Sequence, residues 1–245
     1  RIQDISIPEK KSKLFEQFYS DLVVNYETSS DRQDYQPSSI LYICGGSSLD
    51  HPFMIDLIEW RRKQGYVVYA VSTSETGTNT SSVSTYIRNA YQNWDVPPEI
   101  VGLVGDVGGS YNISTYNIEG GAGDNEYAYL TGNDFLPEVF VGRISVNGSS
   151  DIANIINKTL TYEKALEQDD EWYERAALVG DPSSSGLSTI TTNQYIQNIM
   201  TNFGFEDVRT NYNDGNYNNW VEDQFASKVL YYNYRGYIGS SGIGQ

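Results

Sequence analysis

A single cysteine and a single histidine limit the nucleophilic and metal chemistry open to this chain. Cys44 ends the apolar run 40–44, where a thiol usually packs as a small hydrophobic side chain with a raised pKa. His51 follows after a Gly- and Ser-rich turn, at the expected start of a helix. Core and capping roles are therefore favoured over a Cys44–His51 catalytic pair. Neither an internal disulfide nor a Cys/His zinc centre is predicted.

Two aspartates follow apolar runs, each directly after a glycine. They are Asp106, in Gly105-Asp106, and Asp181, in Gly180-Asp181. A carboxylate in such a place can orient a histidine, bind a cation or hold a substrate group. The alternative is a local role, because aspartate after glycine often caps a helix or forms an Asx-turn.

An oxygen-rich segment at residues 131–138 suggests a cation site. Asp134 and Glu138 offer carboxylates with main-chain carbonyls between them, the type of ligand that Ca²⁺ takes. The spacing is not that of an EF-hand, and a plain surface turn is the alternative. Residues 107–135 form the longest irregular stretch, and loops of this length are usually functional or ordered by a bound group.

Strands that alternate with helices must position these side chains. Apolar runs predict strands at residues 40–44, 66–71, 100–106, 139–144, 176–181 and 229–234. Amphipathic patterns predict helices at residues 53–63, 83–94, 152–166 and 189–203. This order predicts an α/β fold, with a mostly parallel sheet covered on both faces. Ligands of such sheets bind beyond the carboxyl ends of the strands, which places Asp106 and Asp181 at the ligand edge.

Composition excludes some classes of function. Sixteen Lys and Arg against 32 Asp and Glu give a net charge of −16, which argues against a nucleic-acid-binding protein. No apolar run approaches the ~18–20 residues of a membrane span. The first residues do not form an export signal, so any such signal has been removed or lies elsewhere. Residues 1–37 are interpreted as a lead-in segment with a short helix, and residues 38–245 as the main domain.

Three stretches together resemble the gingipain-type cysteine peptidases. Residues 100–106 match the family's "LVGD" strand, and residues 124–145 match its S-D-x-x-Y, G-N-D and E-V-F-I-G-R motifs in order. Tyr162-Glu163, Trp172 and residues 229–239 resemble the region that delivers the family's catalytic histidine. The resemblance runs from about residue 40 to the end, and its middle stretch is the most specific.

The resemblance implies a caspase-like three-layer α/β/α sandwich. It implies a bacterial protein, secreted or at the cell surface, that cleaves protein or peptide substrates with a Cys–His dyad. It also implies a structural Ca²⁺ held by the carbonyls of Thr131 and Leu136 and by Asp134, Glu138 and Asp106. Asp181 falls near the family carboxylate that orients the histidine.

This chain departs from the family pattern at three places. Tyr237 occupies the histidine position of N-Y-x-G-H-G, and tyrosine, with an ordinary pKa near 10, does not take up a proton near neutral pH. Thr189 aligns with the aspartate of the substrate pocket in arginine-specific members, so arginine specificity is not implied. Cys44 does not match the nucleophile, whose strand is expected after residue 245. The domain is therefore expected to be an amino-terminal part, with the cysteine on a continuation or on a second chain.

Two other functions remain open. A catalytically inactive relative, stabilised by calcium, would recognise peptides or surface partners, and Tyr237 favours this alternative. An unrelated doubly wound α/β protein would bind a small ligand at Asp106 and Asp181. The first alternative is distinguished from a peptidase by whether a continuation supplies both a cysteine at a strand end and a usable base.

Overall fold

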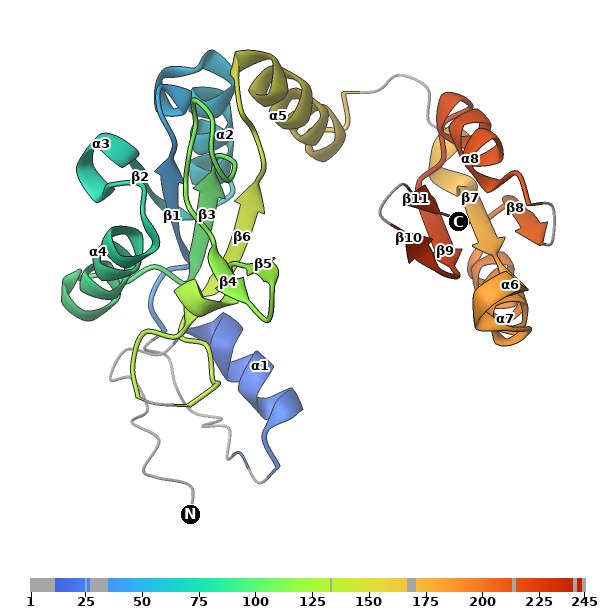
Figure 1. The fold of residues 1–245 in the computed structure, drawn as a ribbon, viewed down its shortest axis with the longest axis horizontal. Helices are drawn as coiled ribbons and strands as arrows, with labels where there is room; N and C mark the ends of the chain where they lie inside the picture. Colours follow the sequence, from blue (N-terminus) through green and yellow to red (C-terminus); the bar gives the residue numbers. More distant parts are fainter. Residues whose placement is uncertain are drawn as a thin grey trace. The chain divides into compact units, whose positions relative to one another are not determined.

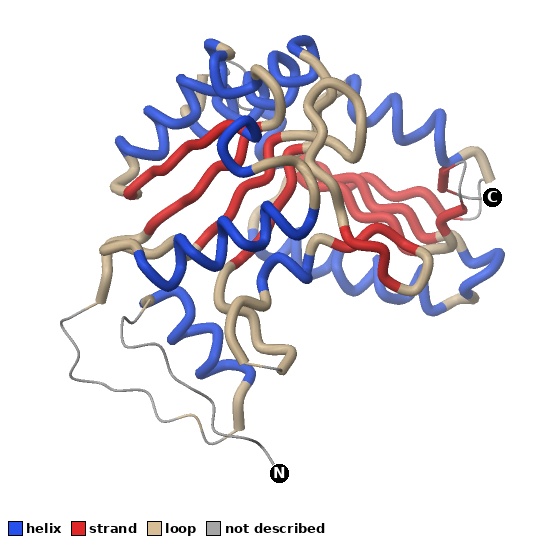
Figure 2. Tube along the Cα trace, turned by 60° about the vertical axis from the view of Figure 1, so that its left-hand side comes forward, coloured by secondary structure: helices blue, strands red, loops and turns tan. Residues whose placement is uncertain are grey.

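A computed structural model describes residues 12–24, 26, 35–132, 134–166, 171–212, 215–239 and 242–243 (Figure 1). The chain forms two compact units, Arg1–Leu166 and Glu167–Gln245. The boundary between them falls inside residues 38–245, which the sequence predicts as one domain. Each unit has its own parallel sheet with helices on both faces (Figure 2).

The sheet of the first unit has the strand order β2-β1-β3-β6. Its strands are β1 (Ser39–Cys44), β2 (Val67–Ser72), β3 (Ile100–Val104) and β6 (Phe140–Ile144). All neighbouring strands are parallel. Every residue of β1 is buried, as its uninterrupted apolar sequence predicts for a strand covered on both faces.

Helices cover both faces of this sheet. On one face, α2 (Pro52–Lys63) and α5 (Ser149–Glu163) contribute Met54, Leu57, Ile152 and Ile156 to one apolar cluster. On the other face, α4 (Thr80–Asn93) contributes Val83, Ile87 and Ala90 to a second cluster. The side chains of β1 alternate between the two clusters. The three layers that the sequence predicts are confirmed in this unit.

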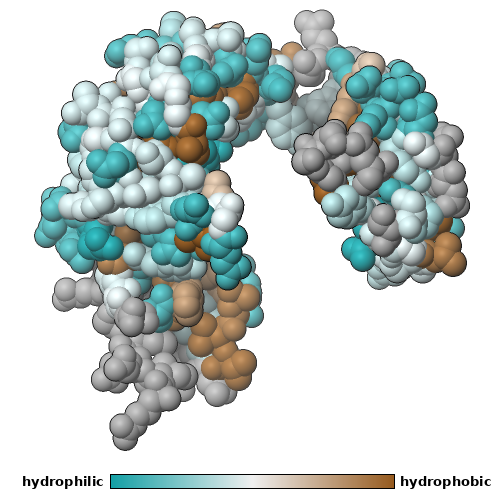
Figure 3. Space-filling model, viewed as in Figure 1, coloured by the Kyte–Doolittle hydropathy of each residue, from teal (hydrophilic) through white to brown (hydrophobic). Residues whose placement is uncertain are grey.

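The lead-in segment contributes helix α1 (Lys13–Leu22) to the first unit. Ser12 caps this helix by accepting a hydrogen bond from the amide of Phe15. The ring of Phe15 stacks on that of Phe140 at 4.4 Å between centroids, and the Tyr19 hydroxyl donates to the Pro137 carbonyl at 2.9 Å. Hydrophobic residues gather on the surface over α1 (Figure 3), where the exposed fraction of Leu22 is 64%.

The shorter elements of the first unit lie in its connections. They are η1 (Ser48–Asp50), α3 (Thr73–Thr76), β4 (Tyr116–Ile118), β5 (Gly121–Gly123) and η2 (Asn125–Ala128). The antiparallel pair of β4 and β5 lies inside the stretch predicted to be irregular. Among the residues that the structure describes, no helix is both long and apolar enough to span a bilayer.

The second unit has the strand order β8-β7-β9, again parallel. Its strands are β7 (Arg175–Gly180), β8 (Asp207–Tyr212) and β9 (Tyr231–Arg235). Helix α7 (Ser188–Phe203) packs on one face through Met200, and α8 (Tyr217–Ala226) packs on the other through Tyr217 and Val221. The remaining elements are η3 (Glu171–Glu174), α6 (Pro182–Ser185), β10 (Ile238–Gly239) and β11 (Gly242–Ile243).

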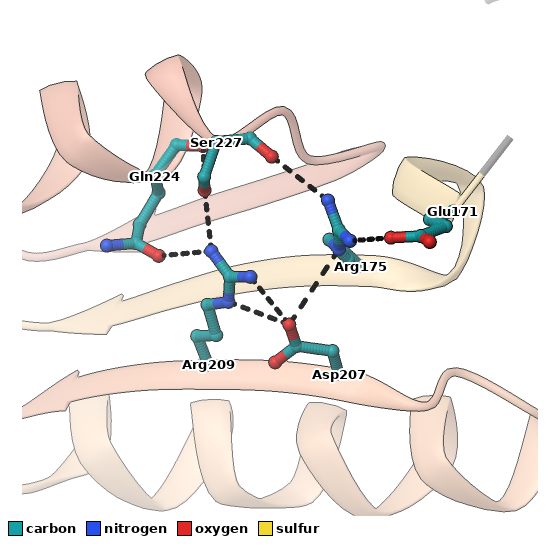
Figure 4. Close-up of polar contacts among 6 residues, drawn as sticks. All are labelled: Glu171, Arg175, Asp207, Arg209, Gln224 and Ser227. Atoms are coloured by element: carbon teal, nitrogen blue, oxygen red, sulfur yellow. Dashed lines mark hydrogen bonds and ion pairs between the residues drawn. The ribbon is translucent and has the colours of Figure 1, made fainter. Parts of the chain in front are cut away.

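Charged side chains tie the amino edge of this second sheet (Figure 4). Arg209 donates two hydrogen bonds to the carboxylate of Asp207 and one each to Gln224 and Ser227. Arg175 donates to Glu171 at 2.6 Å. This network joins β7, β8 and α8 at the edge opposite the strand ends that carry Asp181 and Tyr237.

Candidate active site

In the first unit, the carboxyl edge of the sheet is filled by the chain itself. A Cβ atom at Gly45 would lie 2.3 Å from the carbonyl oxygen of Tyr111, and one at Gly105 would lie 2.2 Å from it. The main chain of Tyr111 thus packs directly on both glycines. Asp106 helps to hold this loop: its amide donates to the Tyr111 carbonyl at 3.2 Å, and its carboxylate accepts from the Val107 amide at 2.8 Å. The carboxylate has a local role here, the alternative that the sequence left open.

A salt bridge that the sequence analysis missed fixes the same segment. Arg143 on β6 donates from Nε and Nη2 to both carboxylate oxygens of Asp124, at 2.7 and 2.8 Å. Its Nη1 donates to the carbonyls of Gly105 and Ile113. Burial alone would raise the pKa of Asp124, but the hydrogen bonds from Arg143 and Thr115 outweigh it and lower that pKa. Both partners lie in the stretch that carries the family resemblance, yet nothing in their spacing indicates that they pair.

The proposed calcium loop lies at the opposite, amino edge of the first sheet. The Glu138 carboxylate accepts from the amides of Leu130 and Thr131, at 2.6 and 3.1 Å, and from the Thr131 hydroxyl at 2.7 Å. Asp134 accepts from the Leu136 amide at 2.9 Å. Four of the five residues predicted as ligands therefore share one short loop.

Asp106 cannot share an ion with this loop. Strands β3 and β6 run parallel, with Ile100 opposite Phe140. Asp106 follows the carboxyl end of β3, whereas Glu138 precedes the amino end of β6. The five residues of the strand alone separate the two side chains by about 16 Å. The expectation that Asp106 and Glu138 bind one ion is wrong.

The donor set of the loop fits a hard cation only in part. Its oxygen atoms are of the kind that Ca²⁺ takes, but six to eight of them are usual. In the described part of the chain, no three His, Cys, Asp or Glu side chains gather at one place. Asn133 lies outside the described residues. A calcium ion bound by Thr131, Asp134, Leu136 and Glu138 stays a prediction.

In the second unit, Asp181 lies at the carboxyl edge between β7 and β9. Its amide donates to the Arg235 carbonyl at 2.9 Å, which joins the ends of the two strands. Asp181 is 2% exposed, and its carboxylate accepts hydrogen bonds from the amide and the hydroxyl of Ser183, at 2.9 and 2.6 Å. Burial would raise the pKa of Asp181, but the hydrogen bonds from Ser183 and Tyr234 outweigh it, so the pKa is lowered.

Tyr237 follows the end of β9 at the same edge. Its exposed fraction is 53%, and its main-chain carbonyl accepts from the Tyr234 hydroxyl at 2.8 Å. That hydroxyl also lies 3.3 Å from Oδ2 of Asp181. The family resemblance implies that Asp181 lies near the histidine position, which Tyr237 occupies, and the parallel pairing of β7 with β9 brings the two residues to one edge of the second unit. Tyr234, which connects them, was missed as a site residue although it lies in the family motif.

Thr189 lies in the first turn of α7. It is 2% exposed, and its hydroxyl donates to the Gly186 carbonyl at 3.0 Å. The side chain therefore serves the turn that leads into α7. Contact between Thr189 and a substrate stays a prediction.

Cys44 and His51 have the core and capping roles that the sequence favours. Cys44 is fully buried, and burial raises its pKa to about 12. The Nδ1 atom of His51 caps α2 by accepting from the Phe53 amide at 3.3 Å, and its Nε2 lies 3.0 Å from the Ser149 hydroxyl. A thiol so buried is not available as a nucleophile.

The chain has known relatives. The sequence model of peptidase family C25 matches residues 33–245. Gingipain R2 of Porphyromonas gingivalis (strain W83) is 24% identical over 230 residues, which are 91% of this chain and 31% of that protein. Lys-gingipain of P. gingivalis (strain ATCC 33277) is 25% identical over 181 residues, 71% of this chain and 10% of that protein.

Solved structures have the same fold. The crystal structure of the Arg-specific cysteine proteinase gingipain R superposes with a TM-score of 0.70 at 22% identity, covering 88% of this chain and 49% of that one. The complex of the pro- and mature domains of P. gingivalis RgpB gives 0.69 at 23%, covering 82% and 48%. The chain spans about half of these solved chains and under a third of the curated relatives. Since the family model matches most of the sequence, this chain belongs to peptidase family C25, a family of cysteine-type peptidases that includes the gingipains.

Proposed function

We propose that this chain is part of a secreted or cell-surface bacterial cysteine endopeptidase of the gingipain type, which hydrolyses peptide bonds in protein or peptide substrates. The observation that carries the proposal is the carboxyl edge of the second unit. There a buried carboxylate, Asp181, and the residue at the family's histidine position, Tyr237, lie together and are bridged by Tyr234.

The nucleophile in this proposal comes from outside residues 1–245, on a continuation or on a second chain. Cys44 is buried, has a raised pKa and belongs to the core of the first unit. A cysteine thiolate at the carboxyl edge of the second unit would attack the scissile carbonyl and form a carbon–sulfur bond. Protonation of the leaving amine breaks the carbon–nitrogen bond, and water then hydrolyses the thioester. Asp181 would hold the protonated base in place.

The base is the open part of this mechanism. A histidine takes up a proton near neutral pH, whereas a tyrosine does not. Tyr237 therefore requires that a base come from another residue at the same edge. The same substitution supports the alternative function, a catalytically inactive module that keeps the fold and binds peptides or surface partners.

Calcium belongs to the proposal as a structural ion. Asp134 and Glu138, with the carbonyls of Thr131 and Leu136, would hold it in the loop before β6. The support is that these oxygen donors lie within eight consecutive residues of one tightly bonded loop. A bound cation there would fix the loop beside β6 and α1.

The test is labelling by electrophilic peptides. The longest natural reading frame that contains residues 1–245 is expressed and treated with peptidyl acyloxymethyl ketones that carry charged or uncharged P1 residues. We expect covalent labelling of one cysteine, abolished when that cysteine is replaced by alanine.

The matched control is Cys44→Ser, which must label as fully as the wild type. Labelling that is lost with Cys44→Ser contradicts the assignment of the nucleophile. No labelling by any peptide, together with reversible peptide binding, contradicts the peptidase function and supports the inactive module.

A further inference from the structure

Two tyrosines on β9 differ in what their hydroxyl groups do. Tyr232 and Tyr234 are two residues apart, face the same side of the sheet and pack in the same apolar cluster with Tyr217 and Val221 of α8. The Tyr232 hydroxyl is buried and has no hydrogen-bond partner among the described residues. The Tyr234 hydroxyl instead reaches the strand end, 2.8 Å from the carbonyl oxygen of Tyr237 and 3.3 Å from Oδ2 of Asp181.

The geometry of the Tyr234 hydroxyl makes it a connector. A phenol has one proton to donate, and both of its neighbours here, a carbonyl and an ionised carboxylate, can only accept. The proton therefore lies between the two acceptors, with the shorter contact to Tyr237. One side chain thus holds the main chain after β9 and the carboxylate after β7.

Gly236 shows how closely these groups approach. A Cβ atom at residue 236 would lie 2.5 Å from the Tyr234 hydroxyl oxygen and 2.8 Å from Cβ of Asp181. Both distances are shorter than real contacts between such atoms, so only glycine fits between Asp181 and Tyr234. The amide of Asp181 closes the arrangement by donating to the Arg235 carbonyl at 2.9 Å.

We propose that Tyr234 is a positioning residue for the proposed active site. Its hydroxyl holds the main chain of residue 237 against Asp181, and so sets the direction in which the side chain at 237 leaves the sheet edge. Because the contact is to a main-chain carbonyl, it operates whichever side chain occupies position 237. Its consequence for catalysis rests on the peptidase function proposed above, but the geometry does not.

The first experiment measures position without activity. Tyr234→Phe and its matched control Tyr232→Phe are made in residues 1–245, each alone and combined with Tyr237→His. His51 is the only natural histidine, so the imidazole introduced at 237 gives a separate NMR signal. We expect Tyr234→Phe to increase the mobility of that imidazole. We also expect it to raise the hydrogen-exchange rate of the Asp181 amide by about two- to tenfold, the range that the loss of one net hydrogen bond gives.

Tyr232→Phe should change neither quantity, because the hydroxyl that it removes has no described partner. Cooperative melting of both variants confirms that each is folded. Equal effects of the two variants on the imidazole and on the Asp181 amide overturn the positioning role.

The second experiment measures peptide hydrolysis in the longest natural reading frame. A positioning role predicts that Tyr234→Phe lowers kcat by about two- to tenfold and leaves KM unchanged, whereas Tyr232→Phe leaves both unchanged. A kcat for Tyr234→Phe equal to that of Tyr232→Phe overturns the proposal. If the wild type hydrolyses no peptide, the proposed function fails, and the imidazole and exchange measurements still decide the positioning role.

Discussion

Arg143 and Asp124 form a two-pronged salt bridge, in which Nε and Nη2 lie 2.7 and 2.8 Å from the two carboxylate oxygens. The two side chains are 12% and 25% exposed. Because the same guanidinium also donates to the carbonyls of Gly105 and Ile113, it ties β6 to the loop that fills the carboxyl edge of the first unit. Planar, bidentate donors of this kind are the strong ones among charged hydrogen bonds.

Arg143→Leu should lower the free energy of unfolding of residues 1–245 by about 2–4 kcal/mol, because it leaves a partly buried carboxylate and two carbonyls without their donor. Urea unfolding at pH 7 measures the change. Arg62→Leu is the matched control, since its ion pair with Glu59 has side chains 51% and 53% exposed, and such pairs contribute at most about 1 kcal/mol. Equal losses in the two variants would contradict the structural role of Arg143.

Acid should weaken the contact between α2 and α5. Hydrogen bonds from Arg61 lower the pKa of Glu163. Burial opposes this shift, and a hydrogen bond from Trp60 adds to it. A folded-state pKa below the unfolded value near 4.3 gives stability that is present above that pH and is lost as the pH falls through the folded pKa. The stability difference between wild type and Glu163→Gln should therefore shrink below about pH 4.3, as measured by urea unfolding from pH 7 to pH 3. Glu59→Gln is the control, and a difference that stays constant with pH contradicts the assignment.

Much of the fold could be predicted from the apolar runs. Residues 40–44 and 100–104 are uninterrupted apolar or small residues, as expected where both faces of β1 and β3 are covered. The predicted ends of the strands were less accurate. The strand predicted at residues 229–234 is Tyr231–Arg235, since its tyrosines are partly exposed and blur the boundary.

The site was predicted unevenly, for physical reasons. Strand polarity places Asp106 after a strand and Glu138 before one, so their separation was readable from the sequence, and the family resemblance obscured it. The bond from Tyr234 to Tyr237 was not readable, because it depends on a turn at Gly236 that brings a carbonyl back toward the strand. The pairing of Arg143 with Asp124 likewise depends on how the hairpin of β4 and β5 returns.

Cys44 should be unreactive in the native protein. Its thiol is fully buried and its pKa is raised to about 12 by burial, so little thiolate is present at pH 8 and reagents cannot reach it. Labelling by iodoacetamide, followed by mass spectrometry, should require urea and follow the unfolding curve. Glutathione under the same conditions gives the rate of a free thiol. Native Cys44 reacting at that rate would contradict a buried core position.

Calcium should raise the melting temperature of residues 1–245 if the loop before β6 binds it. Binding to the folded state alone adds about 2.7 kcal/mol when the free ion is at 100 times its Kd. Melting is followed by circular dichroism with Ca²⁺, with EDTA, and with Mg²⁺, which prefers a smaller octahedral site. We expect Ca²⁺ to raise the midpoint and Asp134→Ala to abolish that rise.

Asp106→Ala is the control that the fold supplies for this prediction. Its carboxylate lies at the other end of the parallel strands, so the variant should keep the full response to Ca²⁺ even where it lowers the midpoint itself. Loss of the response in both variants would contradict a site in the loop of residues 131–138. An identical melting midpoint in Ca²⁺ and in EDTA would leave Glu138 with a purely local role. Its carboxylate already accepts hydrogen bonds from Leu130 and Thr131, and these bonds close the loop without an ion.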